Sequence, residues 1–421
     1  MKILVLGAGV LGTTTAYYLA REGHEVHVVD RQAEAGMETS RGNGGVIHTS
    51  EVEPWSQPGM PAKVLSWIGR TDAPMLLRLS ALPSIWQWGL GFVRNCALDR
   101  YRLASEINLR LALLTLEEVK TIREESGVQY DLAQRGSMKI FRNADELESA
   151  VAETALLRPH GMVFDRLTSR QCVEIEPALA PIEGQLAGGL HAPLDEHGDC
   201  HKFTAGLRAY IAQRYGVTFH FGTTIERLVR SGDKVIGVET SAGRLTADAY
   251  VAALASFSAP LLSPIGVRVD VYPAKGLAVT VPAANWPDGP KVPVIEISKL
   301  FGLIRIGDRY RCSGSVEFNG WNTTPSRERA QAIVANVTAV FPDFARCYDP
   351  ATADVWAGLR PMPASGSPYV GKSSLDNLYL NCGHGHLGWT MSCGSSRALV
   401  DTMLGRRAPI DMTGLTPATH L

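Results

Sequence analysis

Glycines at positions 7, 9 and 12 form a G-x-G-x-x-G motif, the spacing with which proteins bind the pyrophosphate of a dinucleotide. The first glycine of such a motif permits a tight turn, the second lets phosphate approach the backbone, and the third lets a helix pack closely on a strand. Asp30 is placed to accept hydrogen bonds from an adenosine ribose, and an acid there disfavours a 2′-phosphate. The motif therefore predicts a site for NAD or FAD formed by Gly7, Gly9, Val10, Leu11, Gly12 and Asp30.

A strand, a helix and a second strand are needed to position these residues. Residues 2–6 are an apolar run of strand length, residues 10–22 carry apolar side chains at helical spacing, and residues 25–29 resemble a strand that ends at Asp30. Because the motif glycines fall within the N-terminal apolar stretch, we interpret it as part of the fold and not as a signal peptide. This order of elements favours dinucleotide binding over a βαβ unit that only packs.

Two other glycine-rich segments are expected to approach the same ligand. Residues 37–48 contain glycines and an asparagine, which favours a second ligand-contacting loop over a plain surface loop. Near the C-terminus a predicted strand, 377–382, leads through the turn 383–388 into a predicted helix, 389–404. The N-terminus of that helix would direct partial positive charge at the other end of the cofactor.

Composition limits the class of protein. The chain has 421 residues, a net charge of −1 and basic residues that are mostly scattered singly, which argues against nucleic acid as a partner. Its seven cysteines form no C-x-x-C pair, as is typical of a reducing compartment. No apolar run is long enough to span a membrane. We therefore expect a cytoplasmic protein, with peripheral contact to the inner face of the cell membrane left open.

Two stretches permit more than one interpretation. Residues 54–102 are rich in tryptophan and proline, and a helical insert packed on the body is favoured over a lid or membrane-surface patch in which Trp86, Trp88 and Phe92 share an apolar face. Residues 195–201 combine Asp, Glu, His and Cys, but their spacing is not that of a zinc site. A turn leading into a capped helix is favoured there, and no metal is expected.

The remaining pattern predicts an α/β fold with a second, α+β domain. Residues 267–281, 292–306 and 310–316 are expected to be strands of a second sheet, which is antiparallel. We expect a Rossmann-type cofactor domain from residues 1–50, 165–260 and 350–421. The substrate-binding domain, which includes the helical insert, would comprise residues 51–164 and 261–349.

Taken together, the motifs resemble those of a known family. They are the N-terminal glycine motif with Val-Val-Asp-Arg, Met-Glu-Thr-Ser before an Asn-Gly turn, Pro-Trp-x-x-Pro-Gly, Arg-Asn-Cys, Asp-Glu-x-Gly-Asp-Cys, Tyr-Pro-x-Lys-Gly, Gly-Leu-Arg-Pro-Met and Gly-His-Gly-x-Leu-Gly-Trp-Thr-Met. Over nearly its whole length the chain resembles the bacterial FAD-dependent D-amino acid dehydrogenases of the small-subunit type. These lie within the glycine oxidase and D-amino acid oxidase superfamily. The resemblance implies FAD in place of NAD.

The resemblance also assigns roles by position. It implies FAD contacts at Gly9, Val10, Leu11, Asp30, Arg31, Ser40, Asn43, Gly44, Gly45 and Val46, with Ile225 and Ala253 beside the adenine end. It implies that the isoalloxazine is lined by Gly385, His386, Leu387, Gly388, Trp389 and Thr390. Arg360 matches the arginine that binds the substrate carboxylate, with a structural ion pair as the alternative. Candidates for polar contacts near the ring are His48, Lys275 and His384.

The implied reaction is oxidation of a D-amino acid, which could be cyclic such as D-proline or D-hydroxyproline, by hydride transfer from Cα. Such chemistry depends on positioning more than on a protein acid or base. The sequence departs from the family at Leu277, at 294–298 and at His48, so the substrate is not carried over. Two alternatives stay open: a glycine or sarcosine oxidase that releases hydrogen peroxide, and a flavin-binding subunit of a larger complex. The electron acceptor, a quinone, another carrier or oxygen, is not determined.

Overall fold

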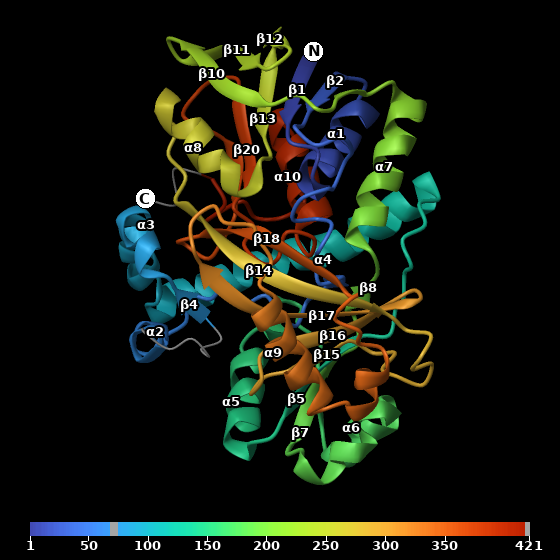
Figure 1. Cartoon of the computed structure of the whole chain (residues 1–421). Coiled ribbons are helices and arrows are strands. Elements are labelled where there is room, and N and C mark those ends of the chain that lie inside the picture. The colour runs from blue at the N-terminus through green and yellow to red at the C-terminus, as the bar shows by residue number, and fades with distance from the viewer. Residues whose placement is uncertain (68–74, 417–421) are drawn as a thin grey trace.

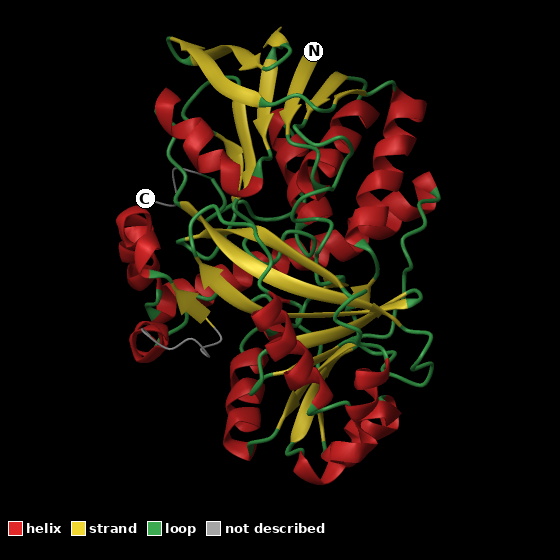
Figure 2. Ribbon diagram, in the orientation of Figure 1, coloured by secondary structure: helices red, strands yellow, loops and turns green. Residues whose placement is uncertain are grey.

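The computed structural model describes residues 1–67 and 75–416, which fold around two sheets (Figures 1 and 2). The first is six-stranded, in the order β19-β20-β13-β1-β2-β9. Its strands are β1 (Lys2–Leu6), β2 (Glu25–Val29), β9 (Thr218–His220), β13 (Ala249–Ala252), β19 (Tyr369–Lys372) and β20 (Leu378–Cys382). All neighbours are parallel except β19 and β20. The expected Rossmann-type arrangement is thus present at the N-terminus.

Helices α1 (Val10–Arg21), α7 (Cys200–Tyr215) and α10 (Ser392–Met403) lie beside the six-stranded sheet (Figure 1). The buried face of α1 shares one hydrophobic core with Phe203 and Leu207 of α7 and Leu399 of α10. The long helix α4 (Leu98–Ser126) packs into this core through Leu111 and Ile122. It ends at Gly127, which has the left-handed backbone conformation that glycine adopts without steric cost. The apolar side chains whose helical spacing predicts these helices are therefore the ones that hold the helices together around the first sheet.

The second sheet has nine strands and occupies the lower half of Figure 1. Its continuous order is β18-β14-β17-β16-β15-β5-β7-β6, and β4 (Met75–Leu77) pairs with β17. The strands are β5 (Ser137–Phe141), β6 (Asp165–Leu167), β7 (Gly188–Ala192), β14 (Val271–Pro282), β15 (Val294–Glu296), β16 (Phe301–Ile306), β17 (Arg309–Phe318) and β18 (Asp354–Pro363). Its core contains Val279, Leu303 and Val337, the last from α9 (Arg327–Thr338). The predicted second sheet is present and mostly antiparallel.

The sheets divide the chain differently from the expected boundaries. Residues 165–192 were assigned to the cofactor domain, but they supply β6 and β7 to the nine-stranded sheet, as does β18 within 350–421. Strand β18 pairs along its length with β14, from Val271 opposite Pro363 to Thr280 opposite Asp354. Pairing between segments so distant in sequence is decided by tertiary contacts, which local patterns do not encode.

The smaller elements lie around these sheets. Strands β10 (Ile225–Ser231), β11 (Lys234–Thr240) and β12 (Gly243–Leu245) form an antiparallel meander. Helix α8 (Ser258–Leu262) lies next to it (Figure 1), and β3 (Val46–Ile47) pairs with β8 (Glu196–His197). Beyond the nine-stranded sheet, α5 (Ala144–Ala155) and α6 (Ser169–Ile175) complete the lower half.

The stretch 54–102 contains α2 (Met60–Trp67) and α3 (Leu82–Asn95). Trp88 and Phe92 are buried and stack with ring centroids 5.1 Å apart, so this part is a packed helical insert. Trp86 is 56% exposed, so it does not share a face with the other two, as the less favoured alternative of a lid or membrane-surface patch supposed. Residues two apart on a helix point about 200° from one another, which places Trp86 on the outer side. The predicted insert also includes residues 68–74, which lie outside the described part.

Candidate active site

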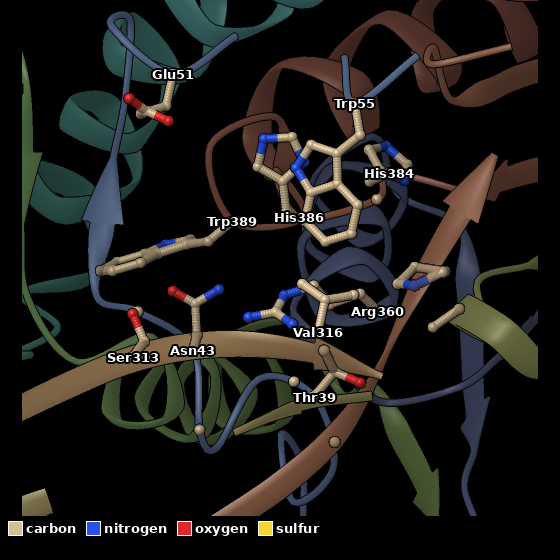
Figure 3. Close-up of a pocket in the computed structure, with 18 of the residues that line it drawn as sticks. Thr39, Asn43, Glu51, Trp55, Ser313, Val316, Arg360, His384, His386 and Trp389 are labelled. Carbon is tan, nitrogen blue, oxygen red and sulfur yellow. The ribbon is translucent and has the colours of Figure 1, made fainter. Parts of the chain in front are cut away.

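One large cavity, with a volume of about 1400 Å³, extends from the glycine motif to the nine-stranded sheet. Its walls come from the loops after β1 and β2, from β14, β17 and β18, and from the turn before α10. Figure 3 shows side chains from the loop after β2, from β17 and β18, and from the turn before α10 pointing into it. A space of this size, lined by apolar surface and a few polar groups, is typical of a cofactor and substrate site.

The glycine motif forms the end of the cavity beneath α1. Gly7 has φ +102°, and a Cβ on it would lie 2.6 Å from the carbonyl oxygen of Ala253. A Cβ on Gly12 would lie 1.8 Å from the carbonyl oxygen of Gly7, so helix and turn touch as the motif requires. On the cavity side, a Cβ on Gly9 would meet only the Ser40 hydroxyl, at 3.6 Å. The backbone is therefore open at the position where a pyrophosphate is expected.

Asp30 lies at the end of β2, as predicted. One of its oxygens accepts a hydrogen bond from the amide of Ala8 at 2.7 Å, and the other accepts from the amide of Gln32 at 2.8 Å. Burial raises the pKa of this carboxyl against those two bonds. Next to it, the Arg31 guanidinium lies 4.0 Å from the ring centroid of Phe257 and pairs with Glu38. These contacts fix both side chains at the rim of the cavity.

A buried carboxylate holds the loop that contains His48. The hydroxyls of Thr49, Ser50 and Ser137 donate to Asp195 at 2.8, 2.6 and 2.6 Å. His48 Nδ1 lies 3.7 Å from the same carboxylate. Burial opposes ionisation of Asp195, but His48 and the hydroxyl groups outweigh it, so its pKa is lowered. Sequence reasoning named Asp195 only as part of a turn, whereas the structure makes it the anchor of a cavity wall.

The other parts of the 195–201 cluster confirm the helix-cap interpretation. Asp199 accepts hydrogen bonds from the amides of His201 and Lys202 at the start of α7. Its second oxygen accepts from the Arg309 guanidinium at 2.9 Å. Within residues 1–67 and 75–416, no group of His, Cys, Asp and Glu side chains is arranged to hold a metal ion.

The turn before α10 closes the far side of the cavity. The amide of Gly385 donates to the carbonyl of Pro361 at 2.9 Å, which ties the turn to the strand that carries Arg360. The hydroxyl of Thr390 accepts from the backbone amide of His48 at 3.2 Å. Trp389 is buried and points toward the cavity (Figure 3). The helix itself begins at Ser392, three residues later than predicted, because residues 389–391 complete the turn.

Two histidines of this turn are neutral at physiological pH. Burial lowers the pKa of His384 to about 3, and its Nε2 lies 3.1 Å from the Ser395 hydroxyl. Burial also lowers the pKa of His386 to about 4, against the attraction of Glu51. His386 stacks on Trp55 with ring centroids 5.3 Å apart. Both side chains can exchange hydrogen bonds with a ligand, but neither holds a positive charge.

Arg360 supplies positive charge to this part of the cavity. Burial lowers the pKa of its guanidinium to about 10, which leaves it charged at neutral pH. Its Nη1 is buried and has no hydrogen-bond partner within the described part of the chain. A Cβ on Gly276 would lie 2.0 Å from that atom, and the guanidinium lies 5.9 Å from the ring centroid of Trp55. No acid pairs with Arg360 among the described residues, which argues against the structural ion pair that the sequence left open.

The cavity brings together most of the residues that the sequence singled out. Its walls include Gly7, Gly9, Val10, Leu11, Asp30, Arg31, Ser40, Asn43, Gly44, Val46, His48, Ile225, Ala253, Arg360, His384, Gly385, His386, Gly388 and Trp389. Four others lie behind the wall and shape it: Gly12, Gly45, Leu387 and Thr390. The glycine motif pointed to Gly12, whereas the family resemblance implied the other three.

Lys275 is the predicted polar contact that the structure places elsewhere. Its ammonium forms a buried ion pair with Glu317 at 2.9 Å and donates to the carbonyl of Thr324. Gly276, the next residue of β14, lines the cavity instead. Successive side chains of a strand point to opposite faces, so Lys275 is directed away from the ligand.

Sequence reasoning missed one group of cavity side chains. Glu51 and Glu53, from the loop after β3, and Lys139, from β5, meet at the wall beside His48. The two glutamates follow His48 closely in sequence, which was the available signal. Lys139 lies 86 residues beyond Glu53, and no local pattern connects them.

The residues present fit an FAD molecule. The glycine motif leaves backbone open to a pyrophosphate, Asp30 is placed for a ribose, and Arg31 with Ile225 forms the rim beyond it. The turn 383–389 and the loop 43–48 both line the part of the cavity that would enclose the ring. Within the described residues, this cavity also contains the unpaired Arg360 Nη1 that a substrate carboxylate would satisfy.

Comparison with known proteins agrees with this geometry. The sequence matches the DAO family, described as FAD dependent oxidoreductase, over residues 2–402. It is 43% identical to a D-amino acid dehydrogenase of Paramagnetospirillum magneticum over 416 residues, which cover 99% of this chain and 98% of the relative. It is 41% identical to a D-amino acid dehydrogenase of Bradyrhizobium diazoefficiens, with 99% and 98% covered.

Solved structures share the fold. A glycine oxidase from Geobacillus kaustophilus matches with a TM-score of 0.79 at 20% identity, covering 100% of this chain and 98% of that one. An L-proline dehydrogenase from P. horikoshii matches with a TM-score of 0.78 at 17% identity, covering 99% and 96%. At these identities the likeness concerns the arrangement of the two sheets.

Proposed function

The chain belongs to the DAO family of FAD-dependent oxidoreductases, and on that premise we propose that it oxidises a D-amino acid at Cα. The proposal draws its substrate class from the dehydrogenases that are 43% and 41% identical along the whole chain. The observation that carries it is the unpaired guanidinium of Arg360 within the cofactor cavity. A buried arginine without an acid requires an anion from the ligand.

Arg360 would bind the substrate carboxylate and thereby fix Cα. A planar guanidinium pairs with both oxygens of a carboxylate, which restricts rotation as well as position. The missing side chain of Gly276 leaves room for the guanidinium, and Trp55 covers it. When bound, FAD supplies the acceptor for the hydride that leaves Cα.

The rest of the wall orients the amine and limits the water around it. His384 and His386 are neutral, so they can accept hydrogen bonds from the substrate amine without repelling it. Trp389 and Trp55 provide apolar surface beside these polar groups. No side chain is needed to form a covalent bond with the substrate, because hydride transfer depends on distance and orientation. Loss of the Cα hydride and an amine proton leaves an imino acid, and water would then add to its C=N bond to give an oxo acid and ammonia.

An anaerobic absorbance experiment tests the proposal. The purified yellow protein is mixed with single amino acids in D and L form, with D-proline and cis-4-hydroxy-D-proline, and with glycine and sarcosine. Bleaching by a D-amino acid, and not by its L form, is the expected result. Bleaching by glycine or sarcosine alone would favour the oxidase alternative. Air is then admitted: rapid return of the flavin absorbance indicates an oxidase, and slow return indicates a dehydrogenase. A flavin that no amino acid bleaches would overturn the proposal and favour the subunit alternative.

The reduced cofactor needs an electron acceptor, and the outer face of α3 suggests where the protein meets that acceptor. Leu82, Trp86, Leu90 and Val93 are 44%, 56%, 66% and 54% exposed and recur at helical spacing. Exposed Arg94 lies at the end of the same helix. We propose that this stripe lies on an anionic lipid surface, where a membrane quinone would accept electrons. No helix among residues 1–67 and 75–416 is long and apolar enough to cross a membrane.

Flotation with lipid vesicles tests this contact. The protein should rise with vesicles that contain phosphatidylglycerol, and a Trp86→Ser, Leu90→Ser variant should stay in the dense fraction. Both residues are exposed, so folding should be preserved. A matched control is Trp321→Ser, which removes an exposed tryptophan from outside the insert. Equal flotation of the wild type and the double variant would contradict the proposal.

A further inference from the structure

An ionic cluster lies in the wall of the cavity that the nine-stranded sheet supplies. It consists of Glu51, Glu53 and Lys139, and all three side chains line the cavity. The Lys139 ammonium lies 2.6 Å from Glu51 and 4.0 Å from Glu53. The side chains are 29%, 17% and 12% exposed, respectively, for Glu51, Glu53 and Lys139. Charged groups that lose most of their contact with water are costly to bury, which raises the question of a role of these three beyond packing.

The cluster contains more acceptors than donors. Burial disfavours the charge on Lys139, but Glu51 and Glu53 outweigh it and raise its pKa. Burial likewise opposes ionisation of Glu51, yet Lys139 and His48 lower its pKa. For Glu53 burial prevails, and its pKa is raised despite Lys139. One ammonium therefore serves two carboxyl groups, and the second is incompletely compensated.

The cluster adjoins the place where the substrate is expected. His386 lies close enough to both Glu51 and Arg360 for its pKa to be affected by each. Trp55 joins the same group, since it stacks on His386 and faces the Arg360 guanidinium. Figure 3 shows Glu51 and Arg360 projecting into the one cavity. The side chain of a ligand held at its carboxylate by Arg360 would therefore lie in the same cavity as the cluster.

We propose that Glu51, Glu53 and Lys139 form the side-chain subsite, which selects substrates carrying a hydrogen-bond donor on the side chain. This inference rests on the proposed function and names its substrate class. A hydroxyl or an ammonium group would donate to the spare carboxyl oxygens. An aliphatic side chain of the same size would leave these groups desolvated and unpaired, which is the strongest way for a site to reject an analogue.

Two pairs of matched substrates test the subsite in the FAD-loaded protein. One pair is D-lysine and D-norleucine, and the other is cis-4-hydroxy-D-proline and D-proline. The rate of anaerobic flavin bleaching is measured against substrate concentration, which yields the ratio of maximal rate to Kd. The polar member of one pair should be preferred by at least about tenfold. The pair that shows the preference identifies ammonium or hydroxyl as the group bound.

Neutral variants then assign that preference to the cluster. Glu51→Gln combined with Lys139→Met removes the shorter ion pair and leaves Glu53, whose pKa burial already raises, as the remaining carboxyl of the cluster. Glu53→Gln is a single isosteric change that keeps the ion pair of Glu51 and Lys139. Either variant should reduce the preference for the polar member to about threefold or less. Should the double variant fail to fold, Glu53→Gln and the wild-type ratios still decide. A matched control is Glu148→Gln, which neutralises an exposed carboxylate outside the cavity.

The outcomes separate this inference from the proposed function. If D-amino acids bleach the flavin but the wild type favours neither polar substrate, the subsite is wrong and the function stands. A preference that persists in both variants likewise overturns the subsite. If no D-amino acid bleaches the flavin, the proposed function itself fails.

Discussion

Replacement of Arg360 by alanine tests the substrate site most directly. Burial lowers the pKa of its guanidinium only to about 10, so the residue is charged at neutral pH, and its Nη1 lacks a partner within the described residues. Loss of one charge-assisted, two-point contact should cost roughly 2–4 kcal/mol of substrate binding. At 1.4 kcal/mol for each factor of ten, this corresponds to a rise in Kd of about 30-fold to 700-fold.

The assay is the substrate dependence of anaerobic flavin bleaching, which reports Kd and the rate of reduction separately. Arg360→Ala should retain FAD, because the glycine motif and Asp30 lie at the other end of the cavity. Arg360→Lys keeps the charge but loses the planar fork, so its Kd should lie between those of the wild type and the alanine variant. Arg346→Ala, which removes a surface arginine paired with Asp343, is the matched control. An Arg360→Ala protein with the wild-type Kd would refute the role assigned to this side chain.

Three further predictions concern the walls of the cavity. Gly276→Ala would place a Cβ 2.0 Å from Arg360 Nη1, so we expect a higher substrate Kd with FAD retained; an unchanged Kd would show that the guanidinium moves without loss. Gly12→Ala would place a Cβ 1.8 Å from the Gly7 carbonyl, so the purified variant should have lost the flavin absorbance that Gly89→Ala, with no atom within 4 Å of its added Cβ, retains. The pKa of Asp195 is lowered in the folded protein, so its stabilising effect is present above the ordinary carboxyl pKa of about 4 and is lost as the pH falls through the lowered value. Asp195→Asn should therefore lower Tm at pH 7, with a difference from the wild type that shrinks toward pH 3, and a constant difference across that range would contradict this account.

Local sequence determined the cofactor end of the molecule. The strand, glycine motif, helix and acid of residues 2–30 are contiguous, and each depends on side-chain periodicity or on the absence of a Cβ. For the same reason the turn 383–388 and the cap at Asp199 could be predicted from their residues alone. Helix and turn signals act over a few residues, so they survive without knowledge of the fold.

The tertiary structure decided which distant segments meet. Strand β18 pairs with β14, and this pairing, together with the gap at Gly276, positions Arg360 in the cavity. Lys139 reaches Glu51 because the loop after β3 lies against β5. Lys275 pairs with Glu317 and not with a ligand because alternate residues of β14 face opposite sides. Register between strands far apart in sequence depends on the packing of both sheet faces at once. The sequence therefore specified the cofactor class, whereas the fold specified the wall that we propose as the subsite for the substrate side chain.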